Sequence, residues 1–322
     1  MIIVTGCSGF IASRVCTMLL DAGEEVYGVD NMNDAYAPEL KKWRLEQLID
    51  RPQFKFLEAD ISKPEIQDIE FNETPKALLN LAARAGVRQS VENPWVFYES
   101  NCIGTLNMLE LCRKLSIPKF VLSSTSSLYG AHKISPFSED LSTDKPLSPY
   151  AASKKAAESL SFSYHHLYDI DITILRYFTV YGPAGRPDMS IFRFARWITE
   201  GHSLSVTGDG NQERDFTYVD DVAEGTILAM KPLGYEIINL GSDNPISINQ
   251  AISKLENTIG KKADIVFEPT HPADIFATWA DIDKARKILG WQPSTSFDSG
   301  IENVVNWYNS QRSWASTIEL GN

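Results

Sequence analysis

The chain opens with MIIVTGCSGFIASRVCTMLL (1–20), and this stretch decides how its first half folds. The apolar run MIIVTG predicts a buried strand, and Gly6 and Gly9 indicate a turn directly after it. Apolar residues then recur at helical spacing from Ile11 to Leu19, which predicts an amphipathic helix. A strand, a glycine turn and a helix in this order are typical of a right-handed βαβ unit.

The same alternation continues to about residue 180. Near-continuous apolar runs predict further strands at 25–30, 54–60, 77–82, 120–125 and 172–178. Parallel strands that are buried on both faces have this composition. We therefore predict an α/β fold in which residues 1–180 form a doubly wound parallel sheet of the Rossmann type, completed by a strand near 236–241.

The rhythm changes after residue 180. Helical patterns cover 190–200, 220–230, 247–259, 281–289 and 299–312, and short strand-like segments lie near 203–206 and 214–219. We expect residues 181–322 to form mainly a smaller α/β lobe. Ligands of open α/β sheets bind beyond the carboxyl ends of the strands, so this lobe is expected to bind the substrate.

The composition excludes several classes of protein. Hydrophobic residues make up 43% of the 322 residues and charged residues 22%, as in globular proteins and unlike disordered chains. The net charge of −12 argues against nucleic-acid and anionic-membrane partners. No apolar run is long enough to span a membrane and no targeting signal is evident, so we expect a cytoplasmic protein. The cysteines lack CxxC spacing and the histidines lack an HExxH motif, so no metal is expected.

The glycine turn is the first candidate site. Gly6, Gly9 and Ala12 form a GxxGxxA array, in which small residues allow a tight turn and close approach of a pyrophosphate to the helix N-terminus. Asp30 ends the second strand, where a carboxylate binds the adenosine ribose and repels a 2′-phosphate, which favours NAD over NADP. Asp30 also has the position to cap the turn that follows it. The same site is expected to include the strand-end residues Asp60, Leu81, Ala82 and Ala83.

A tyrosine and a lysine form the second candidate site. In SPYAASKKAAESL (148–160), Tyr150 and Lys154 are four residues apart on a predicted helix and share a face. An ammonium beside a phenol lowers the pKa of the phenol from about 10 toward neutrality, which makes the tyrosine a candidate general base. Tyr129 and Lys133 have the same spacing, but their segment contains a glycine and is predicted to be a loop. The hydroxyl residues Thr125, Ser126 and Ser127 follow the fifth strand, at the mouth of the same crevice.

The glycine array, these hydroxyls and the Tyr-x-x-x-Lys pair resemble the extended short-chain dehydrogenase/reductase family, especially its NAD-dependent nucleotide-sugar epimerases and dehydratases. The segments 30–36, 85–94, 126–130, 176–189 and 214–221 further resemble the UDP-glucuronate (UDP-galacturonate) 4-epimerases. The resemblance implies that Thr125, Tyr150 and Lys154 are catalytic. It extends the NAD site to the following positions: Phe10, Ile11, Asn31, Ile61, Asn101, Ser123, Tyr150, Lys154 and Tyr177.

The resemblance also implies a reaction. Tyr150 takes the proton of the sugar 4-hydroxyl while NAD takes the C4 hydride, and a transient 4-keto sugar forms. Dehydratases of the family carry an Asp-Glu pair where this chain has Ser126 and Ser127, and decarboxylases usually carry a glutamate there. The expected function is therefore NAD-dependent 4-epimerisation of a UDP-hexuronic acid. A 4-epimerase of neutral UDP-hexoses and a UDP-glucuronate decarboxylase remain alternatives.

Substrate contacts follow from the same resemblance. The hydroxyls of residues 125–127 and Arg186 are expected to hold the sugar carboxylate, and Arg214 resembles the arginine that binds the diphosphate. Arg186 alternatively orders its own loop, and Arg214 alternatively pairs with neighbouring acids. Further substrate contacts are expected at Arg88, Thr179 and Asp274, although Ala273 replaces the glycine of the family's PGD motif.

The helices predicted near 94–115 and 149–168 carry more apolar residues than one face against a sheet requires. Examples are Leu106, Met108, Leu109, Leu111 and Leu115 on the first, and Leu160, Phe162, Tyr164 and Leu167 on the second. Family members pair these helices in an intersubunit four-helix bundle, so we expect a homodimer. Alternatively, the second half of the same chain covers them.

Overall fold

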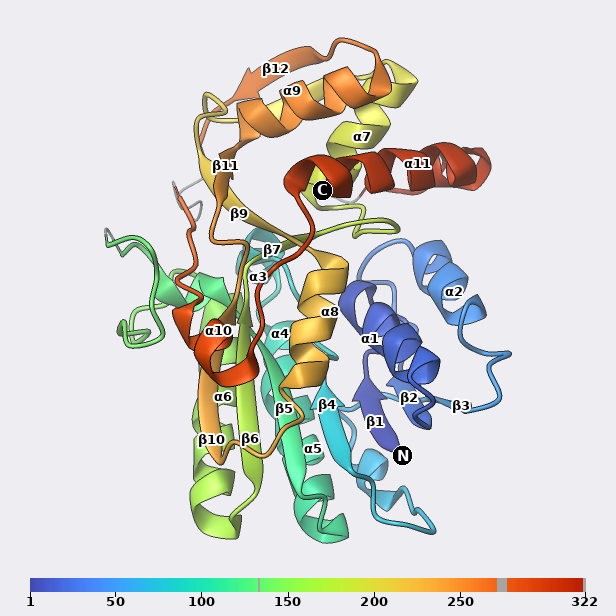
Figure 1. Ribbon diagram of the computed structural model, residues 1–322, viewed down its shortest axis with the longest axis vertical. Coiled ribbons are helices and arrows are strands. Elements are labelled where there is room, and N and C mark those ends of the chain that lie inside the picture. Colours follow the sequence, from blue (N-terminus) through green and yellow to red (C-terminus); the bar gives the residue numbers. More distant parts are fainter. Residues whose placement is uncertain (133, 271–276, 321–322) are drawn as a thin grey trace.

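A seven-stranded parallel sheet forms the centre of the molecule, and a smaller lobe lies beyond one end of its strands (Figure 1). The computed structural model describes residues 1–132, 134–270 and 277–320. The strand order is β10-β6-β5-β4-β1-β2-β3. The strands are β1 (Ile2–Thr5), β2 (Val26–Asp30), β3 (Phe54–Glu58), β4 (Ala77–Asn80), β5 (Lys119–Thr125), β6 (Asp171–Tyr177) and β10 (Tyr235–Leu240). The predicted doubly wound sheet is confirmed, including its completion by the strand near 236–241.

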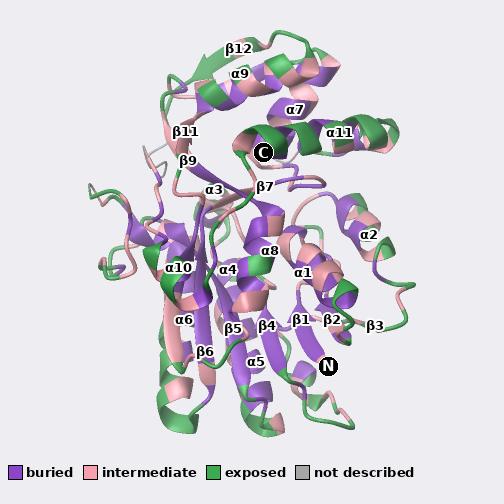
Figure 2. Ribbon diagram, viewed as in Figure 1, coloured by how far each residue is buried: buried purple, intermediate pink, exposed green. Residues whose placement is uncertain are grey.

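Helices cover both faces of this sheet. The helices α1 (Phe10–Asp21) and α8 (Val219–Leu228) lie in front of the sheet in Figure 1, and α5 (Gly104–Leu115) and α6 (Pro149–Tyr168) lie behind it. Alternate strand residues point to opposite faces. Ile2 therefore packs in the core under α1, whereas Ile3 packs in the core under α5 and α6. Because both faces are covered, the five central strands are almost entirely buried, which explains their near-continuous apolar sequences, whereas the edge strands β3 and β10 are partly exposed (Figure 2).

The connection from β4 to β5 differs from its prediction as one helix over 94–115. It contains α3 (Val87–Glu92), α4 (Trp95–Tyr98), a π-helical turn η2 (Glu99–Ile103) and then α5. The apolar spacing of this region is compatible with a continuous α-helix, so the sequence carries no clear signal for the extra residue of the π turn. Such turns occur frequently at functional sites.

The smaller lobe contains two short sheets and three helices. The three-stranded sheet has the order β11-β9-β7, and β12 pairs with β8 in parallel. The strands are β7 (Thr179–Tyr181), β8 (Ser203–Thr207), β9 (Glu213–Tyr218), β11 (Pro245–Ser247) and β12 (Asp264–Glu268). The helices are α7 (Ser190–Glu200), α9 (Ile248–Ile259) and α11 (Phe297–Ala315). Three elements that follow residue 180 nevertheless pack in the layers of the large sheet: α8, β10 and α10 (Asp283–Leu289).

The helix α2 (Pro38–Glu46) joins the two lobes. Its Arg44 is 2% exposed and donates hydrogen bonds to the Ala184 carbonyl at 2.6 Å, to the Ser8 carbonyl at 3.2 Å and to the Tyr36 hydroxyl at 2.7 Å. The neighbouring Trp43 packs against two tryptophans of the C-terminal helix, Trp307 and Trp314. The loop after β2 is thereby tied both to the 184–185 loop and to α11.

We predict that Arg44→Ala lowers the free energy of unfolding by about 3 kcal/mol, because it leaves buried carbonyl groups without a donor. Lys42→Ala removes an exposed cation from the same helix and is expected to change stability by less than about 0.5 kcal/mol. Urea denaturation of both variants measures the difference. Equal stability of the two variants would contradict the role assigned to Arg44.

Candidate functional site

A cleft lies at the carboxyl ends of β1 to β4. The strand order reverses between β1 and β4, which is the place where open α/β sheets bind nucleotides. Nine of the residues predicted to bind the cofactor line this cleft together: Gly6, Gly9, Asp30, Asn31, Asp60, Ile61, Leu81, Ala82 and Ala83. The loop after β2 and the helix α2 add lining residues that the sequence analysis missed: Asn33, Ala35 and Tyr36 on the loop and Lys41 on α2.

The glycine turn forms a cradle that side chains would fill. Gly6 has a φ of +71°, and a Cβ atom there would lie 2.8 Å from the backbone of Ala82. A Cβ atom at Gly9 would lie 2.8 Å from the Gly6 carbonyl oxygen. Gly9 precedes the first turn of α1 and offers no side chain to cap the helix, so the turn leaves space and backbone donors for an anionic group. The residues present therefore fit the pyrophosphate of a dinucleotide.

The acidic residues of this cleft are held in place by backbone donors. Asp30 is 7% exposed and accepts hydrogen bonds from the backbone N–H of Ser8 at 3.1 Å and of Met32 at 2.9 Å. The bond from Met32 shows that Asp30 does cap the following turn, and the same carboxylate also lines the cleft. Burial raises the pKa of Asp60, but hydrogen bonds from Ser62 and Asn31 outweigh burial and lower it below the ordinary value. Asp60 therefore remains ionised.

Tyr150 lies in the first turn of α6, as the sequence predicts. Ser148 caps this helix by accepting a hydrogen bond from the Ala151 backbone N–H at 3.2 Å. Tyr150 is half-buried, and removal from water raises the pKa of its phenol. A hydrogen bond with Thr125 and the positive charge of Arg186 act in the opposite direction. The structure thus brings Tyr150 together with Thr125, at the end of β5, and with Arg186.

Lys154 has a different partner from the one expected. Its ammonium is 3% exposed and donates a hydrogen bond to the Ser123 carbonyl at 2.8 Å. Burial lowers the pKa of Lys154 to about 8, and the nearby Cys102 and Glu158 partly offset this effect. Lys154 is not among the groups that lower the pKa of Tyr150. The expectation that the phenol pKa falls toward neutrality is therefore wrong for this structure, because burial of the phenol outweighs its stabilising neighbours.

Tyr129, the other tyrosine with a lysine four residues later, lines neither cleft. Its ring is 1% exposed in a short 3-10 helix, η3 (Ser126–Tyr129), and its hydroxyl donates to Asn239 at 2.6 Å. Lys133 lies outside the described residues. The same 3-10 helix carries Ser126, which is buried, and Ser127, which is half-buried and donates its backbone N–H to the Thr125 hydroxyl at 3.2 Å.

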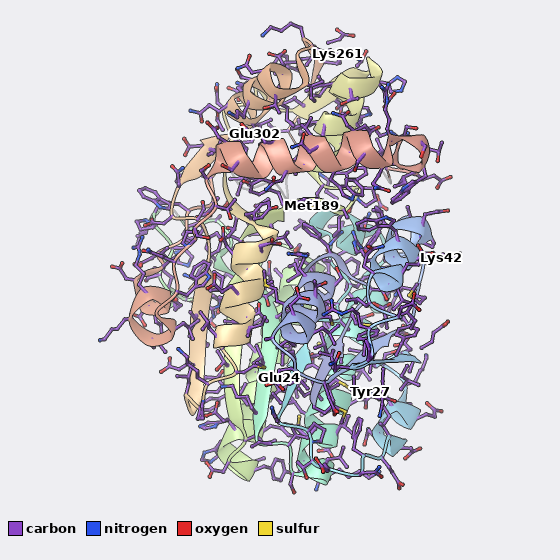
Figure 3. The ribbon with its side chains drawn as sticks, turned by 45° about the vertical axis from the view of Figure 1, so that its right-hand side comes forward. Glu24, Tyr27, Lys42, Met189, Lys261 and Glu302 are labelled. Atoms are coloured by element: carbon purple, nitrogen blue, oxygen red, sulfur yellow. The ribbon has the colours of Figure 1, made fainter. Side chains whose placement is uncertain are left out.

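A second, narrow cleft lies between the lobes, and two of the predicted substrate residues line it, Thr179 and Arg186. Figure 3 shows Met189, another lining residue, at this junction. Arg186 donates to both carboxylate oxygens of Asp188, at 3.0 and 2.6 Å, and to the Ala85 carbonyl at 3.0 Å. Arg186 therefore orders its own loop, which was the alternative interpretation, and also faces Tyr150.

The other predicted substrate residues are spread more widely. Arg88 lies on α3 and donates to the Thr207 hydroxyl at 3.2 Å, which links α3 to β8. Arg214 lies on β9 and donates to the Glu213 carbonyl at 2.8 Å. Asp274 lies outside the described residues. The hydrogen bonds described for Arg88 and Arg214 lead to β8 and within β9.

Several predicted cofactor residues make contacts within the protein instead of lining the cofactor cleft. The Asn101 amide accepts from the Arg84 backbone N–H at 2.9 Å and donates to the Ser153 hydroxyl at 2.9 Å. The Tyr177 hydroxyl bonds Thr226 at 2.8 Å. The remaining residues of this kind are Phe10, which lines the cleft between the lobes, Ile11, which packs on the core, and Ser123, which accepts from Lys154.

Arg84 is a charged residue that the sequence analysis missed. It follows β4, its side chain is half-buried, and Asn101 of the π turn binds both its backbone N–H and its carbonyl, at 2.9 and 3.0 Å. Burial lowers the pKa of Arg84, Asp34 raises it, and Arg186 lowers it further. The guanidinium therefore adds positive charge between the two clefts. Its place directly after the Leu81–Ala83 segment was the available signal.

The comparisons with known proteins agree with this geometry. The model of the NAD dependent epimerase/dehydratase family matches residues 2–241. The chain belongs to this family. A UDP-glucuronate 4-epimerase from Thermodesulfobacterium geofontis is 56% identical over 95% of both chains. The crystal structure of a UDP-glucuronic acid 4-epimerase from Bacillus cereus, in complex with UDP-glucuronic acid and NAD, has a TM-score of 0.90 and 37% identity, covering 96% of this chain and 99% of that one.

A UDP-glucose 4-epimerase from Thermotoga maritima, solved with UDP-glucose, has a TM-score of 0.89 and 31% identity, with coverage of 97% and 99%. The chain is therefore similar both to an enzyme solved with UDP-glucuronic acid and to one solved with UDP-glucose. Among the described residues, no helix is long and apolar enough to cross a membrane. The same part of the chain contains no group of three or more His, Cys, Asp or Glu residues placed to hold a metal ion.

We predict that Gly6→Ala weakens NAD binding at least about tenfold, since the new methyl group overlaps the Ala82 backbone and 1.4 kcal/mol suffices for that factor. Gly23→Ala is the matched control, because Gly23 has a φ of +81° and no heavy atom within 4 Å of its would-be Cβ. Both variants carry backbone strain of about 1–2 kcal/mol. Calorimetric titration with NAD should separate them, and equal affinities would contradict the cradle.

Proposed function

We propose that this protein catalyses the NAD-dependent 4-epimerisation of a UDP-hexuronic acid, interconverting UDP-glucuronate and UDP-galacturonate. The observation that carries the proposal is the position of Tyr150. Its phenol faces Thr125, at the end of β5, and Arg186, which lines the cleft between the lobes. The 56% identity to a UDP-glucuronate 4-epimerase supports the same function.

NAD held by the residues of this cleft would supply an acceptor for the hydride of sugar C4 and would return that hydride, so the overall reaction is redox neutral. In this mechanism, Tyr150 accepts the proton of the 4-hydroxyl and gives it back after the sugar has turned its other face. Thr125 hydrogen-bonds the same hydroxyl and the phenol. The ammonium of Lys154, fixed on the Ser123 carbonyl, supplies positive charge at the start of α6.

The residues after β5 favour epimerisation over the related reactions. The resemblance implies that dehydratases and decarboxylases of this family carry carboxylates at the positions of Ser126 and Ser127. This chain has hydroxyl groups at both positions. A 4-keto uronate loses carbon dioxide readily when its carboxylate aligns with the carbonyl. We propose that the hydroxyls of residues 125–127 and the Arg186 guanidinium hold the carboxylate out of that alignment. Arg88, Thr179, Arg214 and Asp274 are proposed to contact the rest of the UDP-sugar.

The decisive experiment supplies UDP-glucuronate to the purified protein without added NAD and follows the products by NMR. The expected result is the C4 epimer with no net formation of NADH. Release of carbon dioxide would indicate the decarboxylase instead, and turnover of UDP-glucose alone would indicate a 4-epimerase of neutral UDP-hexoses.

Tyr150→Phe is predicted to lower kcat by about 100- to 10,000-fold in the same assay, because the proton acceptor is lost while the ring remains.

We further propose that residues 1–180 mainly bind NAD and that residues 181–322 mainly bind the UDP-sugar.

We also propose that the protein is a homodimer. The prediction that Met108, Leu109 and Leu111 lie at the dimer interface is wrong, because these side chains are at most 1% exposed and pack in the core of the chain itself. Other apolar residues of the same helices are solvent-exposed: Trp95, Tyr98 and Ile103 on α4 and η2, and Phe162, Leu167 and Tyr168 on α6. Since α4 and η2 pack beside α6, these residues offer a surface for a second copy.

We predict that the double variant Trp95→Glu/Ile103→Glu is monomeric, because two buried carboxylates at the proposed interface oppose association. The matched control is Phe267→Glu, which changes an aromatic residue that is 56% exposed on β12, outside that surface. Sedimentation equilibrium gives the mass of each protein. A double variant with the same dimeric mass as wild type, or a monomeric wild type, would refute the proposed interface.

A further inference from the structure

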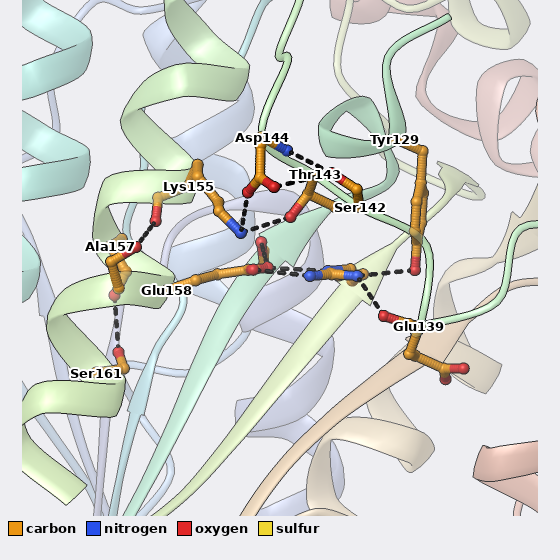
Figure 4. Close-up of polar contacts among 12 residues, drawn as sticks. Tyr129, Glu139, Ser142, Thr143, Asp144, Lys155, Ala157, Glu158 and Ser161 are labelled. Carbon is orange, nitrogen blue, oxygen red and sulfur yellow. Dashed lines mark hydrogen bonds and ion pairs between the residues drawn. The ribbon is translucent and has the colours of Figure 1, made fainter. Parts of the chain in front are cut away.

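A polar cluster is buried between the helix that carries Tyr150 and the large sheet (Figure 4). It consists of Glu158 on α6, Ser124 on β5, Arg176 on β6 and Tyr129 on η3, all at most 4% exposed. None of these four residues lines either of the two clefts described above. The proposed mechanism therefore leaves this cluster without a function.

The Glu158 carboxylate is fully hydrogen-bonded at the centre of the cluster. One oxygen accepts from the Ser124 hydroxyl at 2.6 Å and from Arg176 Nε at 3.0 Å, and the other accepts from Arg176 Nη2 at 2.9 Å. Arg176 also donates to the Tyr129 hydroxyl at 3.1 Å, and Tyr129 donates in turn to Asn239 on β10 at 2.6 Å. Figure 4 shows the dashed bonds that lead from Glu158 on α6 toward Tyr129. This chain of bonds connects one helix with three neighbouring strands.

The cluster acts on the two elements that carry the candidate catalytic residues. Tyr150, Lys154 and Glu158 follow one another at four-residue intervals and share a face of α6. On β5, Ser124 lies between Ser123, whose carbonyl accepts from Lys154 at 2.8 Å, and Thr125, which faces Tyr150. The parallel register pairs Ser124 with Arg176 of β6. A shift of Glu158 would therefore move both the helix and the strand end.

Stability alone does not account for this ion pair. Taking two charges out of water costs about as much as their attraction returns, so apolar residues of similar volume are often equally stabilising. Bidentate bonds between a guanidinium and a carboxylate fix distance and orientation, which apolar contacts do not. The arrangement is suited to positioning.

Glu158 also supplies negative charge to the Lys154 ammonium. The groups that face this ammonium are the Ser123 carbonyl from β5, the Cys102 thiol from the π turn and the Glu158 carboxylate from its own helix. Burial lowers the pKa of Lys154 to about 8, while Cys102 and Glu158 raise it. Loss of the Glu158 charge would leave Arg176 unbalanced nearby and lower the pKa of Lys154 further.

We propose that Glu158 and Arg176 are positioning residues that hold α6, and with it the Lys154 ammonium, against the end of β5. This inference rests on the proposed function for its kinetic readout. Neither residue touches substrate or cofactor; both act through Lys154, Ser124 and the strand end.

The test measures kcat and KM for UDP-glucuronate across the pH range in two variants of Glu158. Glu158→Ala removes the bonds to Ser124 and Arg176 and is expected to lower kcat about 100-fold with little change in KM, as displacements of about 1 Å do. Glu158→Gln retains an oxygen for Ser124 and Arg176 but loses the charge. It is expected to lose less activity and to move the alkaline limb of the kcat profile down by about 1 pH unit.

Asp171→Asn is the matched control. Asp171 pairs with the buried Lys119 and joins the same two strands, β5 and β6, at their opposite ends. This variant is expected to lose stability while its kcat and its alkaline limb remain those of wild type. Thermal unfolding and the NAD content of each protein confirm that folded samples are compared.

Wild-type kcat and an unmoved alkaline limb in both Glu158 variants would overturn the proposal, and so would equal changes in Asp171→Asn. If the wild-type protein does not turn over UDP-glucuronate, the proposed function is refuted. The positioning role is then tested by a measurement that needs no substrate. That measurement is the crystal structure of Glu158→Ala. The Lys154–Ser123 contact of 2.8 Å is expected to lengthen beyond hydrogen-bonding distance, and an unchanged contact would overturn the positioning role.

Discussion

The hydrogen bond from the Lys154 ammonium to the Ser123 carbonyl joins α6 to the last residues of β5. A lysine buried to 3% exposure needs such a partner, since an unpaired ammonium in the core is strongly disfavoured. This contact places the first turn of α6, and with it Tyr150, beside Thr125. The glycine turn after β1 and the hydroxyls after β5 become parts of one site only because the helix lies this close to the sheet.

Charge is distributed unevenly in this molecule. The chain carries a net charge of −12, yet Lys41, Arg44, Arg84 and Arg186 gather around the loops that join the two clefts. Lys41 and Arg186 both have acidic neighbours, Asp30 and Asp188. An acidic surface therefore does not prevent the binding of phosphates and carboxylates, because local cations and backbone donors face them at short range.

Much of the fold could be predicted because burial on both faces leaves a direct trace in the sequence. The seven strands of the large sheet are near-continuous apolar runs, and nine residues at their ends do line one cleft. Side-chain direction leaves no such trace. Helical spacing puts Lys154 on the face of Tyr150, but only the packing of α6 reveals that the ammonium binds Ser123.

The π turn was missed for a related reason. One extra residue in a helical turn barely alters the apolar spacing, yet it determines that Asn101 reaches Arg84 and Ser153 instead of lining the cofactor cleft. The parallel pairing of β8 with β12 joins segments about 60 residues apart, which local patterns cannot register. The expected role of Asn101 thus depended on a detail of backbone geometry.

The link made by Arg44 has a mechanical consequence. Tyr36 and Lys41 form part of the wall of the dinucleotide cleft, and Arg44 fastens this wall to the 184–185 loop of the opposite lobe. The wall cannot swing outward while those bonds hold. An outward movement of this wall would have to break the bonds from Arg44 to the 184–185 loop, so this side of the coenzyme cleft is mechanically linked to the opposite lobe.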